Sequence, residues 1–523
     1  MLSLLAVACG GSARGDLEDD LPAPGGGRRG GADDTGGRGA VAGGPTSSGN
    51  AGRAASGNAG AGGSANPDPR GVELDGTPFY TRVQRLTNRQ WERAVTDILR
   101  FASPRDISAA FARPVAGVTD FDNNERVVFV DATSFLDLEL GAEAAAAIAT
   151  GSPEALAAVY DGSDSAGFVR SVGRRAFRRP LTAAEEERYQ AVFARGEELY
   201  GAGFANGAAL VIRALLQSPH FLYRTELGPA GEPLSSYEVA SKLSFWLLGT
   251  TPSDSLLDAA DAGELDSVER LEAVARQMLE EPGALEVMRD FHGQLLRFDL
   301  YRSVGKPGVS DFDPAINSEL ERASYEFFDR IFRNGAGLRA VFTSTRAFVG
   351  PGLAPYYDLD PPPELELREL DSERSGYFTH VPFLMLWGVD AASDPEARGL
   401  ELQRMLCDAR PPALPLGAAL EGFDGLGRLH EEVQVPTGSY AFAEGDKSFA
   451  GANELMAILA DSAQAHTCYS KNITAYALRR DLVEGDRPLL ESLSQVSLDR
   501  SLKDTIIALV RDPAFRERTE AVQ

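Results

Sequence analysis

The sequence predicts a mainly α-helical protein with minor β structure, built as an array of helical modules behind a disordered N-terminal linker. Three observations predict this class: helix-start signals recur from about Phe79 onward, apolar residues repeat behind them at helical spacing, and strand patterns are sparse. The chain has 523 residues, 43% of them hydrophobic, and a chain of this length normally divides into two or more domains. It contains no apolar run of about eighteen residues or more, the length that a membrane-spanning helix needs.

Capping boxes mark several helix starts. In this motif a Ser or Thr hydroxyl accepts a hydrogen bond from the backbone one turn in, and a Glu or Gln three residues later reaches back to the cap. Each such cap stabilises a helix by about 1 kcal/mol. The pairs with this spacing are Thr87 with Gln90, Thr182 with Glu185, and Ser235 with Glu238.

Other elements are predicted from weaker signals. Asp313 reads as a helix cap followed by Pro314 at the first helical position. A last helix is predicted over residues 498–510, where apolar residues again recur at helical spacing. Strands are predicted only at residues 126–131 and 432–443.

Charge excludes one class of partner. The chain carries 77 acidic and 51 basic residues, for a net charge of −26. Nucleic-acid binding draws its affinity from clustered Lys and Arg, so we expect no nucleic-acid partner. An acidic surface also repels anionic membranes, and attachment to a membrane would therefore need a lipid anchor.

The N-terminus predicts such an anchor. Residues 1–9 form a short apolar run that ends in the small residues Ala6-Val7-Ala8 and then Cys9, which is typical of a lipoprotein signal. A basic segment is missing before the run, so we expect the true leader to be longer. Lipidation of Cys9 would place the protein outside the cytoplasm, in the bacterial cell envelope at the outer membrane or its periplasmic face. The alternative is an ordinary apolar N-terminus with an incidental thiol.

Residues 10–70 predict a flexible spacer. They are mostly Gly, Ala, Ser, Asn, Asp and Arg, with almost no large apolar side chains. Such a segment cannot bury enough surface to offset the entropy of ordering it, and a tethered protein needs a spacer of this kind.

The other two cysteines, Cys407 and Cys468, form an even number that fits one disulfide. Closing this loop would stabilise the fold by about 4 kcal/mol in the chain-entropy model. The alternative is two buried free thiols.

Eight segments, which we call the signature segments, stand in order along the chain: RLTNRQW at 85–91, FDNN at 121–124, RRAFRRPL at 174–181, SPHFLYR at 218–224, ASKLSFW at 240–246, RSGYFTH at 374–380, YALRR at 476–480 and DPAF at 512–515. In this order they resemble a bacterial extracytoplasmic family built around the domain of unknown function 1592, with companion modules 1587, 1595, 1588 and 1585. The resemblance implies an exported protein of unestablished activity, often lipid-anchored and sometimes linked to cytochrome c modules.

Breaks near Thr150, Gly228 and the Pro-rich stretch 358–373 divide the chain into modules. The expected modules are 79–150, 151–228, 229–357, 374–430 and 431–523.

One family feature is missing. Relatives carry a Cys-x-x-Cys-His segment behind a Pro-rich stretch, but here Cys407 leads through Pro411 and Pro412 directly to Leu416. Covalent c-type haem needs two thiols and an adjacent axial His, which excludes it from this chain. We therefore predict no cofactor, and expect a separate cytochrome or redox protein as a possible partner.

The sequence offers no firm catalytic or metal site. The five histidines, His220, His292, His380, His430 and His466, form no HxxxH or HExxH pair. A Gly-x-Ser-x-Gly elbow, a P-loop and a dinucleotide fingerprint are also missing. The catalytic residues, if there are any, stay unknown at this level.

An acidic cluster, Asp120, Asp122 and Asn124, packs oxygen ligands closely enough to be a calcium candidate. It lacks the Gly and the terminal Glu of an EF-hand, and the alternative is a turn rich in Asp and Asn.

An arginine row, Arg170, Arg174 and Arg178, has the spacing of one helix face and is a candidate anion-binding site. The alternative is that these arginines pair with acidic neighbours, which are plentiful in this chain.

Three functional hypotheses follow. The first is a lipid-anchored binding or scaffold protein of the cell envelope. The second is an extracytoplasmic enzyme, such as a hydrolase of a biopolymer with paired carboxylates that lie far apart in sequence. The third is a degenerate relative that lost haem and activity together.

Overall fold

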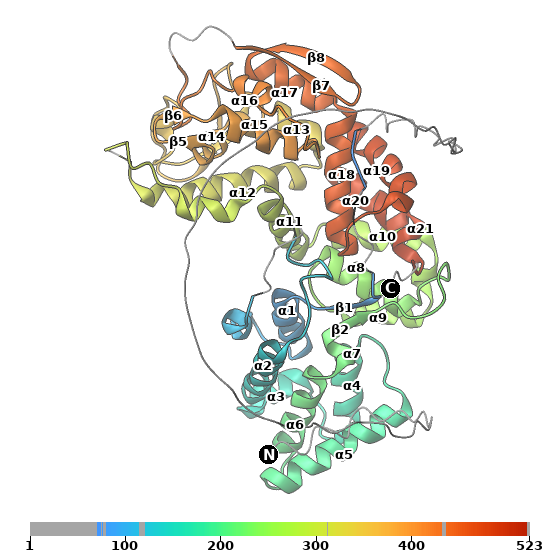
Figure 1. The fold of residues 1–523 in the computed structure, drawn as a ribbon. Helices are drawn as coiled ribbons and strands as arrows, with labels where there is room; N and C mark the ends of the chain where they lie inside the picture. Colours follow the sequence, from blue (N-terminus) through green and yellow to red (C-terminus); the bar gives the residue numbers. More distant parts are fainter. Residues whose placement is uncertain are drawn as a thin grey trace, which may run out of the picture. The chain divides into compact units, whose positions relative to one another are not determined.

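The computed structural model describes residues 71–74, 76, 80–113, 121–310, 312–430 and 436–519, and confirms the mainly α-helical class with minor β structure (Figure 1). Cys9 and the linker 10–70 lie outside the described residues. None of the helices within these ranges combines the length and the apolar composition that a bilayer crossing needs.

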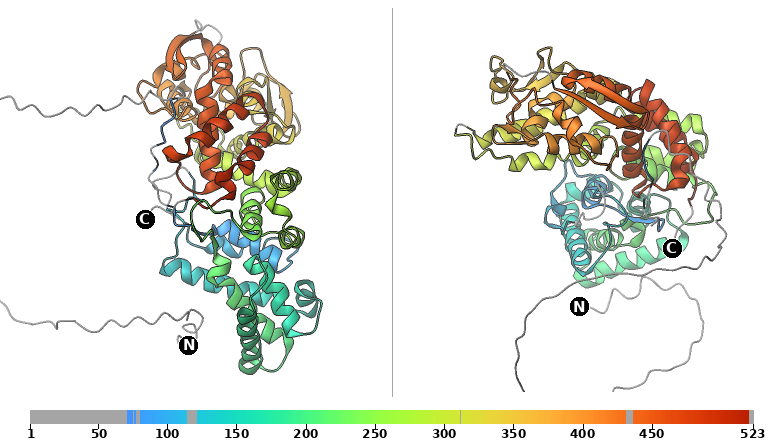
Figure 2. Two further views of the ribbon diagram at one scale, coloured as in Figure 1. Left: turned by 90° about the vertical axis from the view of Figure 1, so that its right-hand side faces the viewer. Right: turned by 45° about the horizontal axis from the view of Figure 1, so that its top comes forward.

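The first group of helices runs from α1 to α7. Their bounds are α1 Asn88–Ile98, α2 Ala132–Thr150, α3 Pro153–Val159, α4 Ser165–Phe177, α5 Ala183–Tyr200, α6 Phe204–Leu216 and α7 Pro219–Leu222. The strands β1 Val83–Arg85 and β2 Tyr223–Thr225 pair antiparallel and join the two ends of this group. Figures 1 and 2 show α2 to α6 gathered together, apart from the helices α12 to α20.

The later helices form the larger part of the described chain. Their bounds are α8 Ser236–Leu247, α9 Asp254–Asp261, α10 Val268–Met278, α11 Pro282–Leu295, α12 Asn317–Arg333, α13 Leu338–Thr343, α14 Val381–Leu386, α15 Pro395–Arg404, α16 Leu414–Ala418, α17 Gly451–Asp461, α18 Ala463–Leu478, α19 Arg487–Asp499, α20 Leu502–Arg511 and α21 Pro513–Arg516. Three more antiparallel strand pairs accompany them: β3 Arg346–Val349 with β4 Glu366–Glu369, β5 Gly388–Val389 with β6 Ala392–Ser393, and β7 Thr437–Phe442 with β8 Gly445–Ala450.

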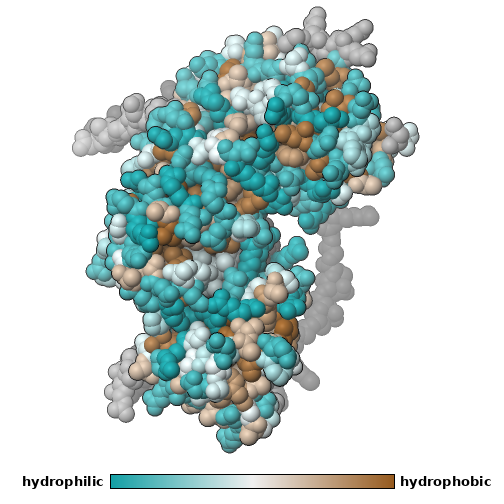
Figure 3. Space-filling view, turned by 180° about the vertical axis from the view of Figure 1, so that it is seen from behind, coloured by the Kyte–Doolittle hydropathy of each residue, from teal (hydrophilic) through white to brown (hydrophobic). Residues whose placement is uncertain are grey.

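The apolar core consists of two clusters. One is built from α1 to α7, and the other from α8 onward. Two aromatic residues cross this division: Phe245 of α8 packs in the first cluster, and Phe121 packs in the second. The two groups of helices are therefore interlocked by buried aromatic side chains. On the face drawn in Figure 3, apolar residues are scattered among hydrophilic ones.

All three predicted capping boxes are confirmed, at Thr87, Thr182 and Ser235. Asp313 also caps as predicted, but the turn that begins at Pro314 is a short 3₁₀ segment that leads into α12. These local signals work because the cap hydrogen bonds are made within four residues and need no tertiary partner.

One strand prediction is wrong. Residues 126–131 form no strand, because the Asn124 side chain accepts from Arg126 N and the Asn124 carbonyl accepts from Val127 N, which closes turns instead. The helix predicted over 498–510 is confirmed as α20, Leu502–Arg511, but it begins later than predicted, because Ser501 is extended and caps it. The strand predicted over 432–443 is confirmed only as β7, and residues 431–435 lie outside the described part.

Cys407 and Cys468 form a disulfide, which confirms the first of the two alternatives for these thiols. The bond joins the chain just after α15 to the first half of α18 and closes a separation of 61 residues. Cys468 is buried, so the bond fixes α18 to its neighbour inside the core.

Candidate functional site

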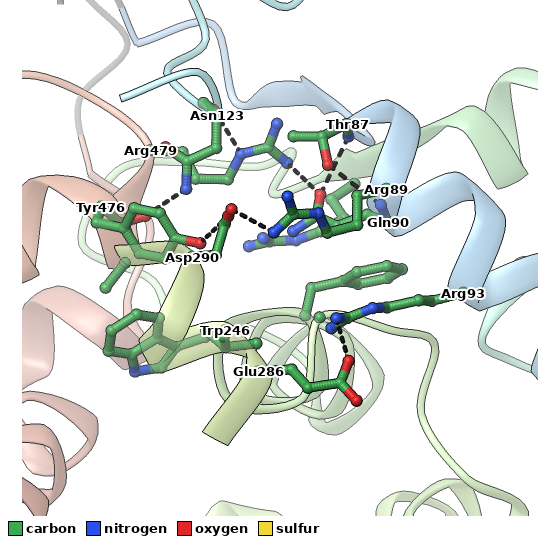
Figure 4. Close-up of a pocket in the computed structure, with 15 residues that line it drawn as sticks. Thr87, Arg89, Gln90, Arg93, Asn123, Trp246, Glu286, Asp290, Tyr476 and Arg479 are labelled. Carbon is green, nitrogen blue, oxygen red and sulfur yellow. Dashed lines mark hydrogen bonds and ion pairs between the residues drawn. The ribbon is translucent and has the colours of Figure 1, made fainter. Parts of the chain in front are cut away.

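The signature segments converge on a small polar cavity that we call the central cavity (Figure 4). Its volume is about 30 Å³, which is room for about one water molecule. It is lined by Thr87, Arg89, Gln90, Arg93, Asn123, Arg224, Phe245, Trp246, Gly249, Glu286, Val287, Asp290, Tyr476, Ala477 and Arg479. Five signature segments contribute to this lining.

Local structure places these side chains. The capping box of Thr87 and Gln90 begins α1, so Arg89, Gln90 and Arg93 project from its first turns. Glu286 and Asp290 are four residues apart on α11 and so lie on one face of that helix. Figure 4 shows these residues of α1 and α11 facing one another across the cavity.

Asp290 is the centre of the cavity's ion-pair network. It pairs with Arg89, and the Tyr476 hydroxyl donates to its Oδ2 over 2.7 Å. Burial, and then the charge of Asp290, raise the pKa of Tyr476 well above its ordinary value. Arg93 forms a second ion pair across the cavity, with Glu286. The carboxylates of α11 are therefore both held by arginines of α1.

A second carboxylate, Asp122, lies near Asp290. Its Oδ1 accepts from Gln294 Nε2 over 3.0 Å, and its backbone N–H donates to Gln294 Oε1 over 2.8 Å. Burial, and then repulsion from Asp290, raise the pKa of Asp122 above its ordinary value. The Asp122 carboxylate therefore lies close enough to the Asp290–Tyr476 pair to be influenced by its charge, although the three residues come from separate parts of the sequence.

Arg479 closes the cavity on the side of α18. It is 2% exposed, and it donates to the carbonyl of Asn123 over 2.8 Å and to the carbonyl of Arg85 over 2.5 Å. Burial, and then the nearby charge of Arg224, lower its pKa to about 9. This guanidinium therefore connects the end of α18 to the end of β1 and to the turn at Asn123.

The same arrangement recurs at three other buried arginines, Arg178, Arg374 and Arg398. Arg178 donates to the carbonyls of His220, Phe221 and Tyr223. Arg374 donates to the carbonyls of Thr379 and Gly427 and lies between the rings of Tyr357 and Phe423. Arg398 donates to the carbonyls of Leu384, Leu420, Phe423 and Asp424. We call Arg178, Arg374, Arg398 and Arg479 the carbonyl-binding arginines.

The predicted arginine row does not form one exposed face. Helix α4 ends at Phe177, and Arg178 follows it in the left-handed region with φ +57° and turns inward. Arg174 pairs with Asp258 and Asp261, and Arg170 lies 3.8 Å from Glu186. The expectation of a continuous row is wrong, because the helix ends one residue too early, and the alternative of acidic partners holds for Arg170 and Arg174.

The calcium candidate is only partly described, since Asp120 lies outside the described residues. Asp122 is hydrogen-bonded to Gln294, and the Asn124 side chain donates to Asp481. Among the residues described, no three His, Cys, Asp or Glu side chains gather in a way that would hold a metal ion.

Two of the buried histidines, His292 and His466, form hydrogen bonds within the core. His292 Nε2 lies 3.0 Å from the Tyr469 hydroxyl, and His466 bonds to Ser497 and to the Ala460 carbonyl. Burial lowers the pKa of His292 to about 3, so this side chain is neutral at any physiological pH.

Sequence reasoning missed Asp290 and the role of Tyr476. Asp290 lies within an ordinary amphipathic helix, and only the packing of α11 against α1 and α18 gives it partners. Tyr476 did stand in a signature segment, so the resemblance was the signal that could have found it.

A pH effect is expected beside the cavity. Burial raises the pKa of Glu125 from its ordinary value near 4.5 to about 7, although Thr81 N and nearby arginines oppose the shift. The folded state thus favours the protonated acid, and the stability that this adds is present below pH 4.5 and lost as the pH rises through 7. Between pH 5 and pH 8 the wild type should lose on the order of 1 kcal/mol more stability than Glu125→Gln. Urea unfolding at both pH values checks this, and an equal loss in both proteins would contradict it.

Family comparisons agree with the order of the modules. The family described as Protein of unknown function (DUF1595) matches residues 164–226, Protein of unknown function (DUF1592) matches 234–359, and Protein of unknown function (DUF1585) matches 445–515. No curated protein and no solved structure matches the chain. Each of the three matched segments contributes to the lining of the central cavity. The chain belongs to a multi-module family built around these domains of unknown function.

Proposed function

We propose that this protein is a lipid-anchored binding or scaffold protein of the bacterial cell envelope. One observation carries the proposal: the carbonyl-binding arginines bind carbonyls of their own chain, and three of them, Arg178, Arg374 and Arg479, stand in signature segments. These guanidiniums are buried and bonded, so they serve to hold the chain's segments together rather than to meet a substrate.

The energetics favour a structural role for these residues. Buried carbonyls without a donor cost about 1–3 kcal/mol each, and one guanidinium satisfies several at once. A lysine could not replace it, because an ammonium is a point donor without the planar fork. The carbonyl-binding arginines thus fix separate segments of the chain to one another, and a protein that holds other proteins needs such a rigid structure.

The enzyme alternative has one observation in its favour, the pair Asp122 and Asp290 beside the Tyr476 hydroxyl. A raised pKa next to a second carboxylate is typical of acid–base sites. Ligand sites, however, usually enclose about 300–1,000 Å³. A volume of about 30 Å³ leaves no room here for a sugar ring or a peptide. The cavity as it stands therefore supports a structural role better than hydrolysis of a biopolymer.

The proposal also includes a membrane anchor and a partner protein. The anchor is an acyl chain on Cys9, and residues 10–70 give the folded part its reach from the membrane. A separate cytochrome or redox protein is the partner that we propose, since relatives carry that module within one chain. The acidic surface suits a partner with a basic face, because opposite charge accelerates association.

Replacing Cys9 by serine tests the anchor. In the native bacterium, with the full leader, the wild-type protein should take up an alkyne-labelled fatty acid and sediment with membranes. Cys9→Ser should lose the label and move to the released fraction, because serine offers no thiol for acylation. The matched control is the double variant Cys407→Ser, Cys468→Ser, which should keep the label. Labelled Cys9→Ser protein would contradict the anchor.

A further inference from the structure

A second cavity lies at the junction of β2, α8 and the C-terminal segment, and we call it the junction cavity. Its volume is about 340 Å³, within the range of small-molecule sites. It is lined by Phe177, Arg178, Arg179, His220, Tyr223, Arg224, Thr225, Glu226, Ser235, Tyr237, Glu238, Ser241 and Arg518. Four of these residues are arginines. What the cavity can bind depends on which of their guanidinium groups are already hydrogen-bonded to the protein itself.

Three of the four guanidiniums are occupied by the chain itself. Arg178 is bonded to the three carbonyls named above, and Arg179 donates two N–H groups to Glu185 over 2.8 and 2.9 Å. Arg518 donates to the carbonyls of Leu227 and Pro233 and to Glu238. None of these three has its charged end available as the main contact for a ligand.

Arg224 is different. Its side chain is 4% exposed, yet its only ion pair with any described residue is to Glu226, at 3.6 Å, beyond hydrogen-bond distance. Glu226 is engaged more closely by others, since its Oε2 accepts from Lys242 over 3.2 Å and from the Tyr80 hydroxyl. Within the described part of the chain, no hydrogen bond from the Arg224 guanidinium is present. A buried guanidinium whose N–H groups have no acceptors is costly, and buried polar groups normally have hydrogen-bond partners.

A second group in the same cavity also lacks a partner. The Ser241 hydroxyl is buried and makes no hydrogen bond to any residue that the structure describes. Ser241 lies on α8, next in the chain to Lys242, which holds Glu226. The junction cavity is therefore lined by one guanidinium fork and one hydroxyl that make no hydrogen bond to any residue the structure describes.

The surrounding charges favour an anion. Five cations surround the cavity: Arg178, Arg179, Arg224, Arg518 and Lys242. Within the described part of the chain, the carboxylates hydrogen-bonded to them are those of Glu185, Glu226 and Glu238. Burial, and then the charge of Arg179, lower the pKa of His220, so this ring adds no charge at neutral pH. The two cations without a hydrogen-bonded carboxylate among these are Arg224, which lies 3.6 Å from Glu226, and the carbonyl-bound Arg178.

The remaining walls indicate the type of anion. The rings of Phe177, Tyr223 and Tyr237 line the cavity and offer apolar surface. A guanidinium fork matches a planar carboxylate in a bidentate geometry. Glu226 and Glu238 also line the cavity, and they would repel a compact dianion such as phosphate more than a monoanion.

We propose that the junction cavity binds a small organic monocarboxylate with an aromatic or apolar body. Arg224 holds the carboxylate, Ser241 donates to it, and the rings of Phe177, Tyr223 and Tyr237 cover the body. This site goes beyond the scaffold role, because it gives the protein a specific small-molecule ligand.

Calorimetric titration of the full-length protein with benzoate tests the proposal. Benzoate should bind saturably, whereas benzamide, which has the same ring without the charge, and inorganic phosphate should bind at least tenfold more weakly. Arg224→Lys keeps a positive charge beside Glu226, so the variant should fold, but it loses the fork and should weaken benzoate at least tenfold. Ser241→Ala should weaken it by about threefold to tenfold, the value of one hydrogen bond.

The matched control is Arg346→Lys, which alters an exposed arginine paired with Glu369 on β3. It should leave benzoate binding unchanged. The absence of saturable benzoate binding to the wild type would overturn the proposal, and so would equal binding to wild type and Arg224→Lys. Phosphate binding as strong as benzoate would overturn the monocarboxylate assignment.

Discussion

Replacing Arg398 by methionine is expected to lower the free energy of unfolding by about 3–5 kcal/mol. Arg398 is fully buried and donates to four carbonyls, at 2.6 to 3.2 Å. Methionine replaces only the apolar stem of the side chain and donates nothing, so the carbonyl of Leu384 in α14 and three carbonyls of the segment after α16 lose this donor. Urea unfolding followed by far-UV circular dichroism measures the loss.

Two further variants make this test specific. Arg398→Lys should fall between wild type and Arg398→Met, because an ammonium can reach one or two of the carbonyls but lacks the fork. Arg346→Met, at an exposed pair with Glu369, should change stability by less than about 1 kcal/mol. If Arg398→Met were as stable as the wild type, the carbonyl-binding arginines would not be what holds the fold.

Removal of the disulfide is expected to have an effect of similar size. The double variant Cys407→Ala, Cys468→Ala should lose about 4 kcal/mol, because the bond closes a loop of 61 residues in the unfolded chain. Both residues are changed together, so that no free thiol is left to pair elsewhere. Urea unfolding without reductant compares the variant with the wild type.

Reductant supplies the control for this prediction. Dithiothreitol should destabilise the wild type toward the value of the double variant and leave the double variant unchanged. A double variant as stable as the oxidised wild type would show that the bond adds nothing to the fold. A reductant effect on the double variant would show that the loss comes from another source.

Local signals in the sequence predicted the helices well, and tertiary contacts explain the failures. The capping boxes at Thr87, Thr182 and Ser235 appear as expected, because each is complete within four residues. The apolar residues of 126–131 suggested a strand, but the Asn124 turns decide their conformation. The predicted row through Arg178 does not form, because the helix ends at Phe177 and the Arg178 guanidinium donates to carbonyls of α7 and β2.

The candidate site was much harder to predict than the fold. The resemblance singled out segments that contain Asn123, Tyr476 and Arg479, but it did not show that they meet. Asp290 had no signal at all, since its helix has ordinary periodicity and its partners lie about 190 residues away on either side. Arg224 stood in a signature segment, yet its lack of hydrogen bonds is a property of packing that no sequence pattern reports.

A native mass spectrum of complexes released from the bacterium's own membranes, without reductant, tests the scaffold role most directly. The account predicts this chain with an acyl mass on Cys9, two hydrogens fewer for the Cys407–Cys468 bond, and at least one further polypeptide bound to it. Haem absorbance in that complex would identify the second polypeptide as a cytochrome. A lipidated chain found only alone, with no second polypeptide at any extraction strength, would contradict the scaffold account.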